Sequence, residues 1–235
     1  VFQYIDFSSR VLAVRGDRLV LIFSRFRDES GNEAEQFHLG EIGADGRIVY
    51  EGRFDADDFG SAYSEMGRRY IAGEGAEYAV NAAVIDGFMR AMDTLDVEAA
   101  RRLCVPGFTW ESTPMTLAAE RRTLDEFFGW VAERARQASK VCNFGSVLRW
   151  VSPDCVVAMG DVLATGSGGE SFHWSRPYVA RFSNGLFASM RQFADEGSAI
   201  AYAESLMARQ ATPPELRNMA TAASARSFAA SLAGD

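Results

Sequence analysis

The sequence is poor in the residue types that build metal centres and disulfide frameworks. It contains 3 cysteines and 2 histidines in 235 residues. Cys104, Cys142 and Cys155 have no metal-ligand spacing, and their odd number is typical of small buried side chains in a reducing compartment. The sequence therefore predicts a cytoplasmic protein without a metal site. It also lacks a phosphate-binding or dinucleotide-binding glycine motif, so we expect no cofactor.

Positive charge and long apolar runs are also scarce. The formal net charge is −8, whereas a nucleic-acid-binding protein needs a basic stripe to offset phosphate charge. No apolar run reaches the roughly 18 residues of a membrane helix, and residues 1–10 lack the features of a signal peptide. We therefore expect neither nucleic acid nor a membrane as a partner.

The apolar content is nevertheless sufficient for a large core. Apolar residues make up 48% of the chain, and folding at this length removes roughly 70% of the unfolded surface from water. Lys140 is the only lysine in an alanine-rich chain, which is typical of a high-GC genome such as an actinobacterium. Because the first residue is Val1, we expect further sequence upstream.

One segment occurs twice. Residues 43–66 match residues 182–205 at a constant offset, so that the turn pairs Asp45-Gly46 and Asn184-Gly185 align. In each copy, short runs rich in β-branched and aromatic residues are separated by turn-forming residues, which indicates an antiparallel meander. The predicted strands are residues 11–14, 19–26, 35–42 and 47–54 in the first copy, and 141–151, 155–165, 170–182 and 186–193 in the second.

Only the second meander is preceded by predicted helices. These are residues 78–92, 97–104 and 124–139, with a short strand at 107–112 between the second and third. Thr123 and Glu126 form a capping-box pattern at the start of the third helix. Asp55 and Asp195 are the expected N-caps of a helix that follows each meander.

This pattern predicts three regions. Residues 1–74 form a partial unit, residues 75–208 a complete unit, and residues 209–235 a helical tail. In the tail, apolar residues have the spacing of a weakly amphipathic helix pair, which either covers an apolar surface or remains solvated. The tail residues concerned are Leu216, Met219, Ala223 and Phe228.

Several motifs carry a resemblance to a known family. They are the helix that ends with Asp93-Thr-Leu-Asp96, the segment AARRLCVPGFTWEST at residues 99–113, and the Asn184-Gly185 hairpin. With the order of helices and strands, they make residues 77–206 resemble the NTF2-like superfamily, which includes SnoaL-like polyketide cyclases and ketosteroid isomerase. Residues 2–72 resemble the C-terminal half of a preceding unit, as in tandem modules at the C-terminal ends of large actinobacterial regulatory proteins.

The resemblance implies an α+β fold in which a curved antiparallel sheet and its covering helices form a cone. A ligand would lie inside the cone among mostly apolar side chains. Along the longest predicted strand, Trp174, Arg176 and Tyr178 alternate with His173 and Ser175. We expect the first set, together with Phe172 and Phe182, to face the cavity. Trp110, Trp130 and Trp150 either join it or are ordinary core residues.

A proton-transfer enzyme of this family would need a carboxylate or histidine inside the cone, because burial raises the pKa of a carboxyl group toward the working pH. The candidates are Glu111, Asp161 and His173. Each has an alternative role. Glu111 follows Trp110 and would point to the opposite side of the strand, where it is solvated or has a capping role. Asp161 would form an outward salt bridge. His173 would lie at an interface.

Two functions remain open. The first is a non-catalytic small-molecule-binding or assembly module of a larger regulatory protein, with an apolar cone-shaped pocket. The second is an isomerase, cyclase or hydratase that uses a pocket carboxylate on an apolar polyketide-like or steroid-like substrate. A bare sheet face drives association, so we also expect a homo-oligomer, or contacts between the first meander and the missing upstream segment.

Overall fold

The computed structural model describes residues 4–112, 120–166 and 168–211. The strands are β1 (Tyr4–Arg15), β2 (Leu19–Asp28), β3 (Glu33–Ile42), β4 (Ile48–Asp55), β5 (Cys104–Ser112), β6 (Glu120–Arg122), β7 (Ala138–Ser152), β8 (Cys155–Gly166), β9 (Ser171–Ser183) and β10 (Leu186–Gln192). The helices are α1 (Phe59–Ala72), the short 3₁₀ helix η1 (Ala76–Tyr78), α2 (Ala79–Thr94), α3 (Val97–Arg102), α4 (Leu124–Ala135) and α5 (Glu196–Ala211).

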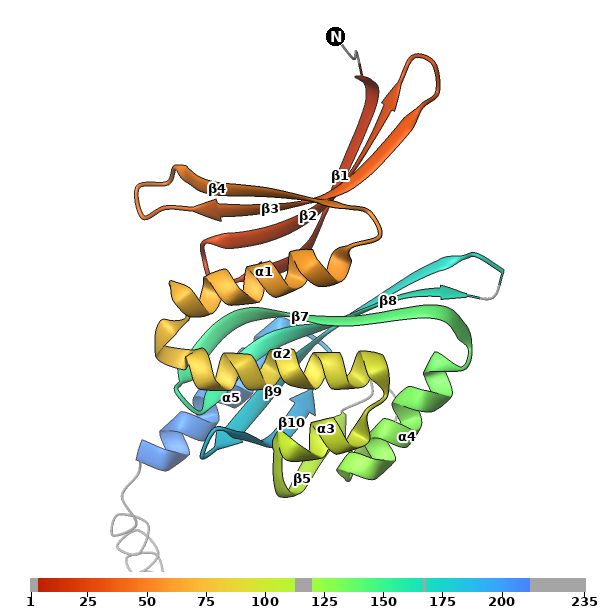
Figure 1. Ribbon diagram of the computed structural model, residues 1–235. Coiled ribbons are helices and arrows are strands. Elements are labelled where there is room, and N and C mark those ends of the chain that lie inside the picture. Colours follow the sequence, from red (N-terminus) through yellow and green to blue (C-terminus); the bar gives the residue numbers. More distant parts are fainter. Residues whose placement is uncertain (1–3, 113–119, 167, 212–235) are drawn as a thin grey trace, which may run out of the picture.

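The strands form one curved, unclosed sheet, and the predicted α+β class is confirmed (Figure 1). Its order is β4-β3-β2-β1-β7-β8-β9-β10-β5-β6. Both predicted meanders are present as antiparallel sets, β1–β4 and β7–β10. The sheet as a whole is mixed, because β10 runs parallel to β5 and the two meanders meet in a parallel contact where Arg15 pairs with Val147.

Helices cover both faces of the second meander. The Met89 side chain of α2 lies 3.6 Å from the position that a Cβ on Gly145 would occupy, which places α2 over one face. Ala199 and Ala203 of α5 pack with Val157 and Val179 on the other face. These faces are called here the α2 face and the α5 face. Figure 1 shows α1 between the first meander and β7.

Two of the three predicted helix starts are confirmed. Thr123 and Glu126 form the predicted capping box of α4, and the Asp195 carboxylate accepts the Ser198 N–H at 2.8 Å at the start of α5. The prediction for Asp55 was wrong, because this residue ends β4. Asp58 instead caps α1 by accepting the Ser61 N–H at 3.2 Å.

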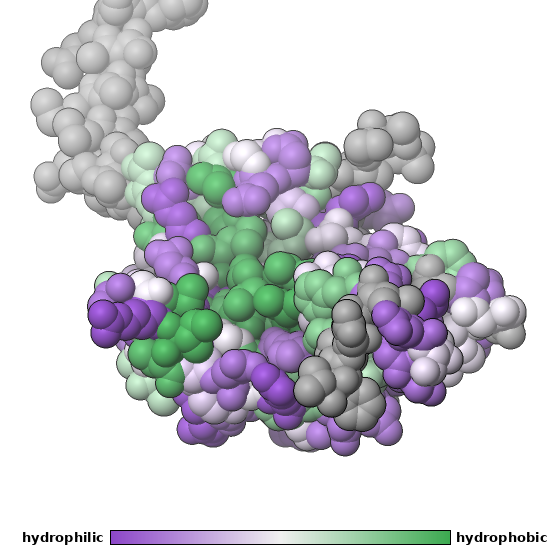
Figure 2. Space-filling view, turned by 90° about the horizontal axis from the view of Figure 1, so that it is seen from above, coloured by the Kyte–Doolittle hydropathy of each residue, from purple (hydrophilic) through white to green (hydrophobic). Residues whose placement is uncertain are grey.

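One hydrophobic core extends through both meanders. Aromatic contacts run from Phe37 of β3 to Phe59 of α1 at 5.6 Å between ring centroids, and from Phe59 to Phe144 of β7 at 5.1 Å. One face of the first meander is therefore covered by α1 and β7. The opposite face exposes Phe7 and Val11, at 58% and 56% of their surface. Figure 2, which looks onto the molecule from above, shows apolar residues gathered in a hollow near its centre.

None of the helices in the described ranges is long and apolar enough to cross a membrane. The predicted tail helices, with Leu216, Met219, Ala223 and Phe228, lie outside the described residues. The division into units at residues 1–74 and 75–208 stays a prediction.

Candidate functional site

Strand register divides the candidate residues between the two faces of the second meander. Residues that pair directly across neighbouring strands lie on the same face. Met190 pairs with Trp110 and with Ala180, whereas Arg191 pairs with Glu111 and with Val179. Alternation along the strands then places Trp110, Trp150, Trp174, Arg176 and Tyr178 on the α2 face. The three potential proton-transfer residues, Glu111, Asp161 and His173, lie on the α5 face.

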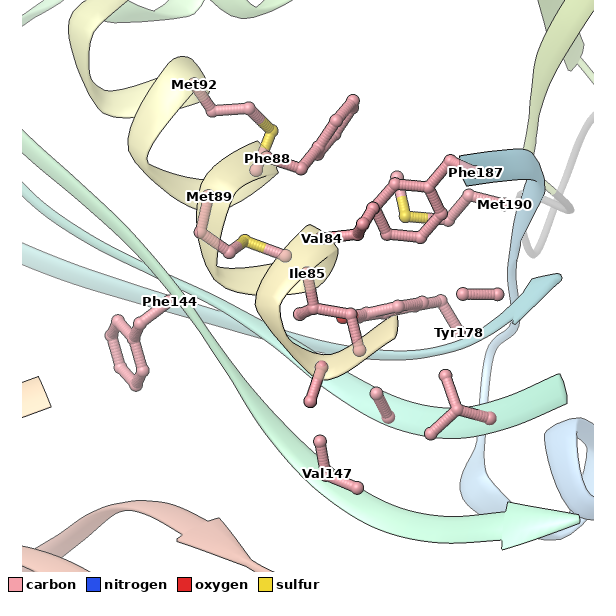
Figure 3. Close-up of a cluster of buried hydrophobic side chains, with 14 of the residues drawn as sticks. Val84, Ile85, Phe88, Met89, Met92, Phe144, Val147, Tyr178, Phe187 and Met190 are labelled. Atoms are coloured by element: carbon pink, nitrogen blue, oxygen red, sulfur yellow. The ribbon is translucent and has the colours of Figure 1, made fainter. Parts of the chain in front are cut away.

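The central part of the α2 face is packed with side chains. Figure 3 shows Val84, Ile85, Phe88, Met89 and Met92 of α2 together with Tyr178, Phe187 and Met190 of the sheet. Phe88 and Phe187 are 5.1 Å apart, in an edge-on arrangement. Tyr178 is only 4% exposed, and its ring lies 3.2 Å from the position that a Cβ on Gly160 would occupy. The tyrosine therefore lies over a sheet row in which glycine leaves room for it.

The predicted pocket tryptophans do not all meet. Trp110 and Trp130 are 5.5 Å apart, and the Arg134 guanidinium lies 4.2 Å from the centre of the Trp130 ring. Trp150 belongs to another cluster, in which it donates a hydrogen bond to the Tyr70 hydroxyl at 2.8 Å and stacks on Tyr78. Of the two alternatives that the sequence left open, the core interpretation fits the packing: Trp110 is buried, and Trp130 and Trp150 pack against separate parts of the same core.

Trp174 and Phe172 form an open aromatic surface at one end of β9. Their rings stack at 5.7 Å with an interplanar angle of 8°, and they are 44% and 43% exposed. In the adjacent strands, Trp174 pairs with Val162, which pairs with Asn143. Asn143, Val162 and Trp174 therefore form one row across the α2 face, called here the Trp174 row. Arg176, also exposed, lies two residues further along β9.

Asp93 of α2 lies at the β7 end of the Trp174 row. Its carboxylate accepts hydrogen bonds from the Asn143 backbone N–H at 2.6 Å and from the Asn143 side-chain amide at 2.9 Å. Partial burial raises the pKa of Asp93, and the two hydrogen bonds from Asn143 oppose that rise. Sequence reasoning used Asp93 only as part of a family motif. Its position at the end of a helix followed by a turn gave no signal that it meets β7.

Asp161 and His173 form a pair on the α5 face. Asp161 Oδ1 lies 2.9 Å from His173 Nε2, and the imidazole lies parallel to the Phe144 ring. The aspartate is buried and the histidine more exposed. Burial raises the pKa of the Asp161 carboxyl group, while hydrogen bonds from Ser175 and His173 favour the ionised form. The sheet separates this pair from Tyr178 and the Trp174 row.

Glu111 occupies the outer part of the same face. Its carboxylate lies 3.8 Å from Arg121 and 3.9 Å from Arg191, and its side chain is partly exposed. Arg191, which pairs with Glu111, also pairs with Val179, six residues along β9 from His173. Glu111 is therefore distant in the sheet from Asp161 and His173, and the structure does not combine the three residues into one site.

A buried polar network at the junction of the two meanders was missed by the sequence analysis. Arg15, which is fully buried, donates hydrogen bonds to Asp86 of α2 and to the Tyr63 hydroxyl of α1, each at 2.5 Å. The Tyr63 hydroxyl donates to the Gly145 carbonyl and accepts the Gly145 N–H, both at 2.9 Å. It thereby satisfies both backbone groups of Gly145 in β7.

The cysteines do not provide reactive groups. Cys104 and Cys155 are buried and Cys142 is half-buried. Burial raises the pKa of Cys104 and of Cys142 to about 12, so both are protonated thiols at neutral pH. Within the described part of the chain, no group of three or more histidine, cysteine, aspartate or glutamate side chains is arranged to hold a metal ion.

Comparison with known proteins finds similar folds only among solved structures. No protein-family model and no curated protein matches the sequence. An NTF2-like protein of unknown function from Burkholderia pseudomallei is 15% identical over 53% of this chain and 97% of its own, with a TM-score of 0.40. A putative polyketide cyclase from Streptomyces antibioticus is 16% identical over 52% of this chain and 96% of its own, with a TM-score of 0.42.

A putative SnoaL-like polyketide cyclase from Jannaschia is also similar, at 17% identity over 57% of this chain and 94% of its own, with a TM-score of 0.40. These three solved structures are described as an NTF2-like protein and as two putative polyketide cyclases, one of them SnoaL-like. Each alignment covers about half of the chain.

Proposed function

We propose that this chain is a non-catalytic module of a larger regulatory protein, and that it binds a small, flat, apolar molecule on the Trp174 row. One observation carries the proposal. The half-exposed, stacked rings of Phe172 and Trp174 lie on the α2 face, while Glu111, Asp161 and His173 lie on the other face. A ligand on the aromatic surface therefore meets none of these three acid-base groups.

The dimensions and chemistry of the Trp174 row fit such a ligand. Asn143, Val162 and Trp174 lie on three adjacent strands, so the row spans about 10 Å at the usual strand spacing. The Trp174 ring supplies a large apolar contact, as aromatic residues do in binding sites. Arg176 and the Asp93-Asn143 pair supply polar groups near its two ends.

The test uses 8-anilinonaphthalene-1-sulfonate, an anion with a flat, apolar naphthalene ring, whose fluorescence rises on binding. Trp174→Ala is expected to weaken binding about tenfold, since an aromatic anchor commonly contributes more than 1 kcal/mol. Val80→Ala is the matched control, because Val80 is an exposed apolar residue on α2 outside the row. Equal affinity in wild type and Trp174→Ala would place the bound probe elsewhere and overturn the proposal.

Exchange of substrate hydrogens with the solvent distinguishes the enzyme hypothesis from the binding proposal. A proton-transfer enzyme exchanges the hydrogens next to the carbonyl of a bound β,γ-unsaturated ketone with solvent deuterium, which NMR detects. Asp93 is the described carboxylate at the Trp174 row, so Asp93→Asn is the informative variant. We expect no exchange above the uncatalysed rate. Exchange that disappears in Asp93→Asn would instead establish catalysis.

A further inference from the structure

β1 has a free edge along its first half. From Asp6 to Val11 every residue pairs with β2 in unbroken register. On the other side of β1, the only pairing among the described strands is with β7, at Arg15. All six side chains from Asp6 to Val11 are exposed, and Figure 1 shows this end of β1 and β2 extending beyond α1. Backbone N–H and C=O groups on such an edge are available for pairing with another strand.

The edge has little of the usual protection against pairing. Natural edge strands are protected by proline, bulges, charged side chains (lysine above all) or a very short length. The segment from Asp6 to Val11 has no proline and no lysine, and its register shifts lie only at its two ends. The other edges differ. β6 has three residues, all charged, and on β4 the side chains of Glu51 and Arg53 already bond to each other at 3.0 Å.

Asp6 and Arg10 are the charged residues of this segment, and they are complementary to each other. Asp6 lies opposite Arg27 of β2 and interacts with it electrostatically, whereas the side chains on the open side of β1 are exposed. Alternation places Asp6 and Arg10 on one face of β1. In one register, the segment pairs antiparallel with a second copy so that Ser8 lies opposite the partner's Ser8. Asp6 then lies opposite the partner's Arg10, and Arg10 lies opposite the partner's Asp6. Two opposite-charge pairs then form at once.

The same register is favourable on the other face. Phe7 lies opposite the partner's Ser9, with the partner's Phe7 and the partner's Val11 as its diagonal neighbours. Diagonal neighbours across antiparallel strands are within reach of aromatic side chains. The exposed Phe7 and Val11 would therefore cover each other across the two-fold axis. A two-fold symmetric interface needs such self-complementarity.

We propose that this chain forms a dimer in which the β1 edge, from Asp6 to Val11, pairs antiparallel with the same edge of a second copy, centred on Ser8. One sheet then runs continuously through both copies. The proposal goes beyond the proposed function, because the Trp174 row lies on another part of the sheet and plays no part in the pairing.

Sedimentation velocity over a range of protein concentrations tests the dimer. Wild type is expected to shift from monomer to dimer as concentration rises. Asp6→Arg alone and Arg10→Asp alone each place like charges opposite each other at two positions, so each is expected to weaken dimerisation about tenfold. Asp45→Arg, in an exposed turn on another strand pair, is the matched control and is expected to dimerise like wild type.

Mixing the two single variants gives the decisive result. In the mixed pair, the two arginines of one chain lie opposite the two aspartates of the other, so a heterodimer is expected at wild-type affinity. The double variant Asp6→Arg/Arg10→Asp is likewise expected to recover dimerisation. A wild type that is monomeric at all concentrations, or single variants that dimerise normally, would overturn the proposal. So would a mixture that fails to associate.

Discussion

Arg15 of β1 and Asp86 of α2 form an ion pair at 2.5 Å, although they are far apart in sequence and the arginine is fully buried. Arg15 is also the residue through which β1 pairs with β7. Tyr63 of α1 completes the group by accepting a second hydrogen bond from Arg15. Four elements, β1, β7, α1 and α2, thus meet at one charged side chain. Arg15 therefore links the two meanders with both helices.

Arg15→Ala is expected to reduce the free energy of unfolding by about 3–5 kcal/mol, because removing one partner leaves the Asp86 carboxylate buried without compensation. Urea denaturation measures the loss. Arg47→Ala is the control, since Arg47 and Asp45 form an exposed pair at 3.8 Å and the change is expected to stay within about 0.5 kcal/mol. Equal effects of the two substitutions would mean that the buried ion pair does not hold the meanders together.

Two buried tyrosines allow a comparison of hydroxyl groups. Tyr63→Phe leaves Arg15 and both backbone groups of Gly145 short of a partner, so we expect a loss of about 1–3 kcal/mol in unfolding free energy. Tyr178→Phe removes a buried hydroxyl that has no hydrogen-bond partner among the described residues. That change is expected to be neutral or stabilising. The reverse order of stabilities in thermal unfolding would contradict this assignment.

Two glycines in α1 are expected to respond in opposite ways to alanine. Gly60 has open space at its Cβ position, so Gly60→Ala is expected to stabilise by about 0.5 kcal/mol through helix propensity. At Gly67 a Cβ would lie 2.5 Å from Asp86 Oδ2. Gly67→Ala is therefore expected to destabilise by about 1–3 kcal/mol, because the Asp86 carboxylate, which is bonded to Arg15, or the helix itself must shift to make room. Circular dichroism during urea unfolding compares the two, and stabilisation by both would show that α1 and α2 are not closely packed.

Local sequence patterns were sufficient for most of the secondary structure. Turn residues and alternation predicted both meanders, and Thr123 with Glu126 predicted the start of α4. Alternation also separated His173 from Trp174 on opposite faces of β9. These features depend on residues a few positions apart, which is why a single sequence contains them.

The polar contacts were not predictable in the same way, because their partners are distant in sequence. Arg15 lies one residue beyond the first predicted strand, and nothing near it indicates that Asp86 and Tyr63 will surround it. The contact between Asp161 and His173 depends on the register of β8 against β9. The tryptophans show the converse case, since Trp110 and Trp150 share a face of the sheet without being neighbours.

Asp161 and Asp195 are expected to change stability with pH in opposite directions. Burial raises the pKa of Asp161 in the folded state, so the folded protein holds this proton more tightly than the unfolded chain does. The corresponding stabilisation is complete below the unfolded pKa of about 3.9 and is lost as pH rises through the folded pKa. Asp161→Asn is therefore expected to gain stability relative to wild type as pH rises from acidic to neutral.

Asp195 provides the control of opposite sign. The Ser198 backbone N–H and hydroxyl bind its carboxylate and lower its pKa, so its contribution is present above the unfolded pKa and is lost as pH falls through the folded pKa. Asp195→Asn should lose stability relative to wild type over the same rise in pH. Urea midpoints measured across that range for all three proteins give the two slopes. Slopes of the same sign would show that burial does not destabilise the ionised Asp161 carboxylate, because its hydrogen bonds to His173 and Ser175 outweigh its loss of hydration.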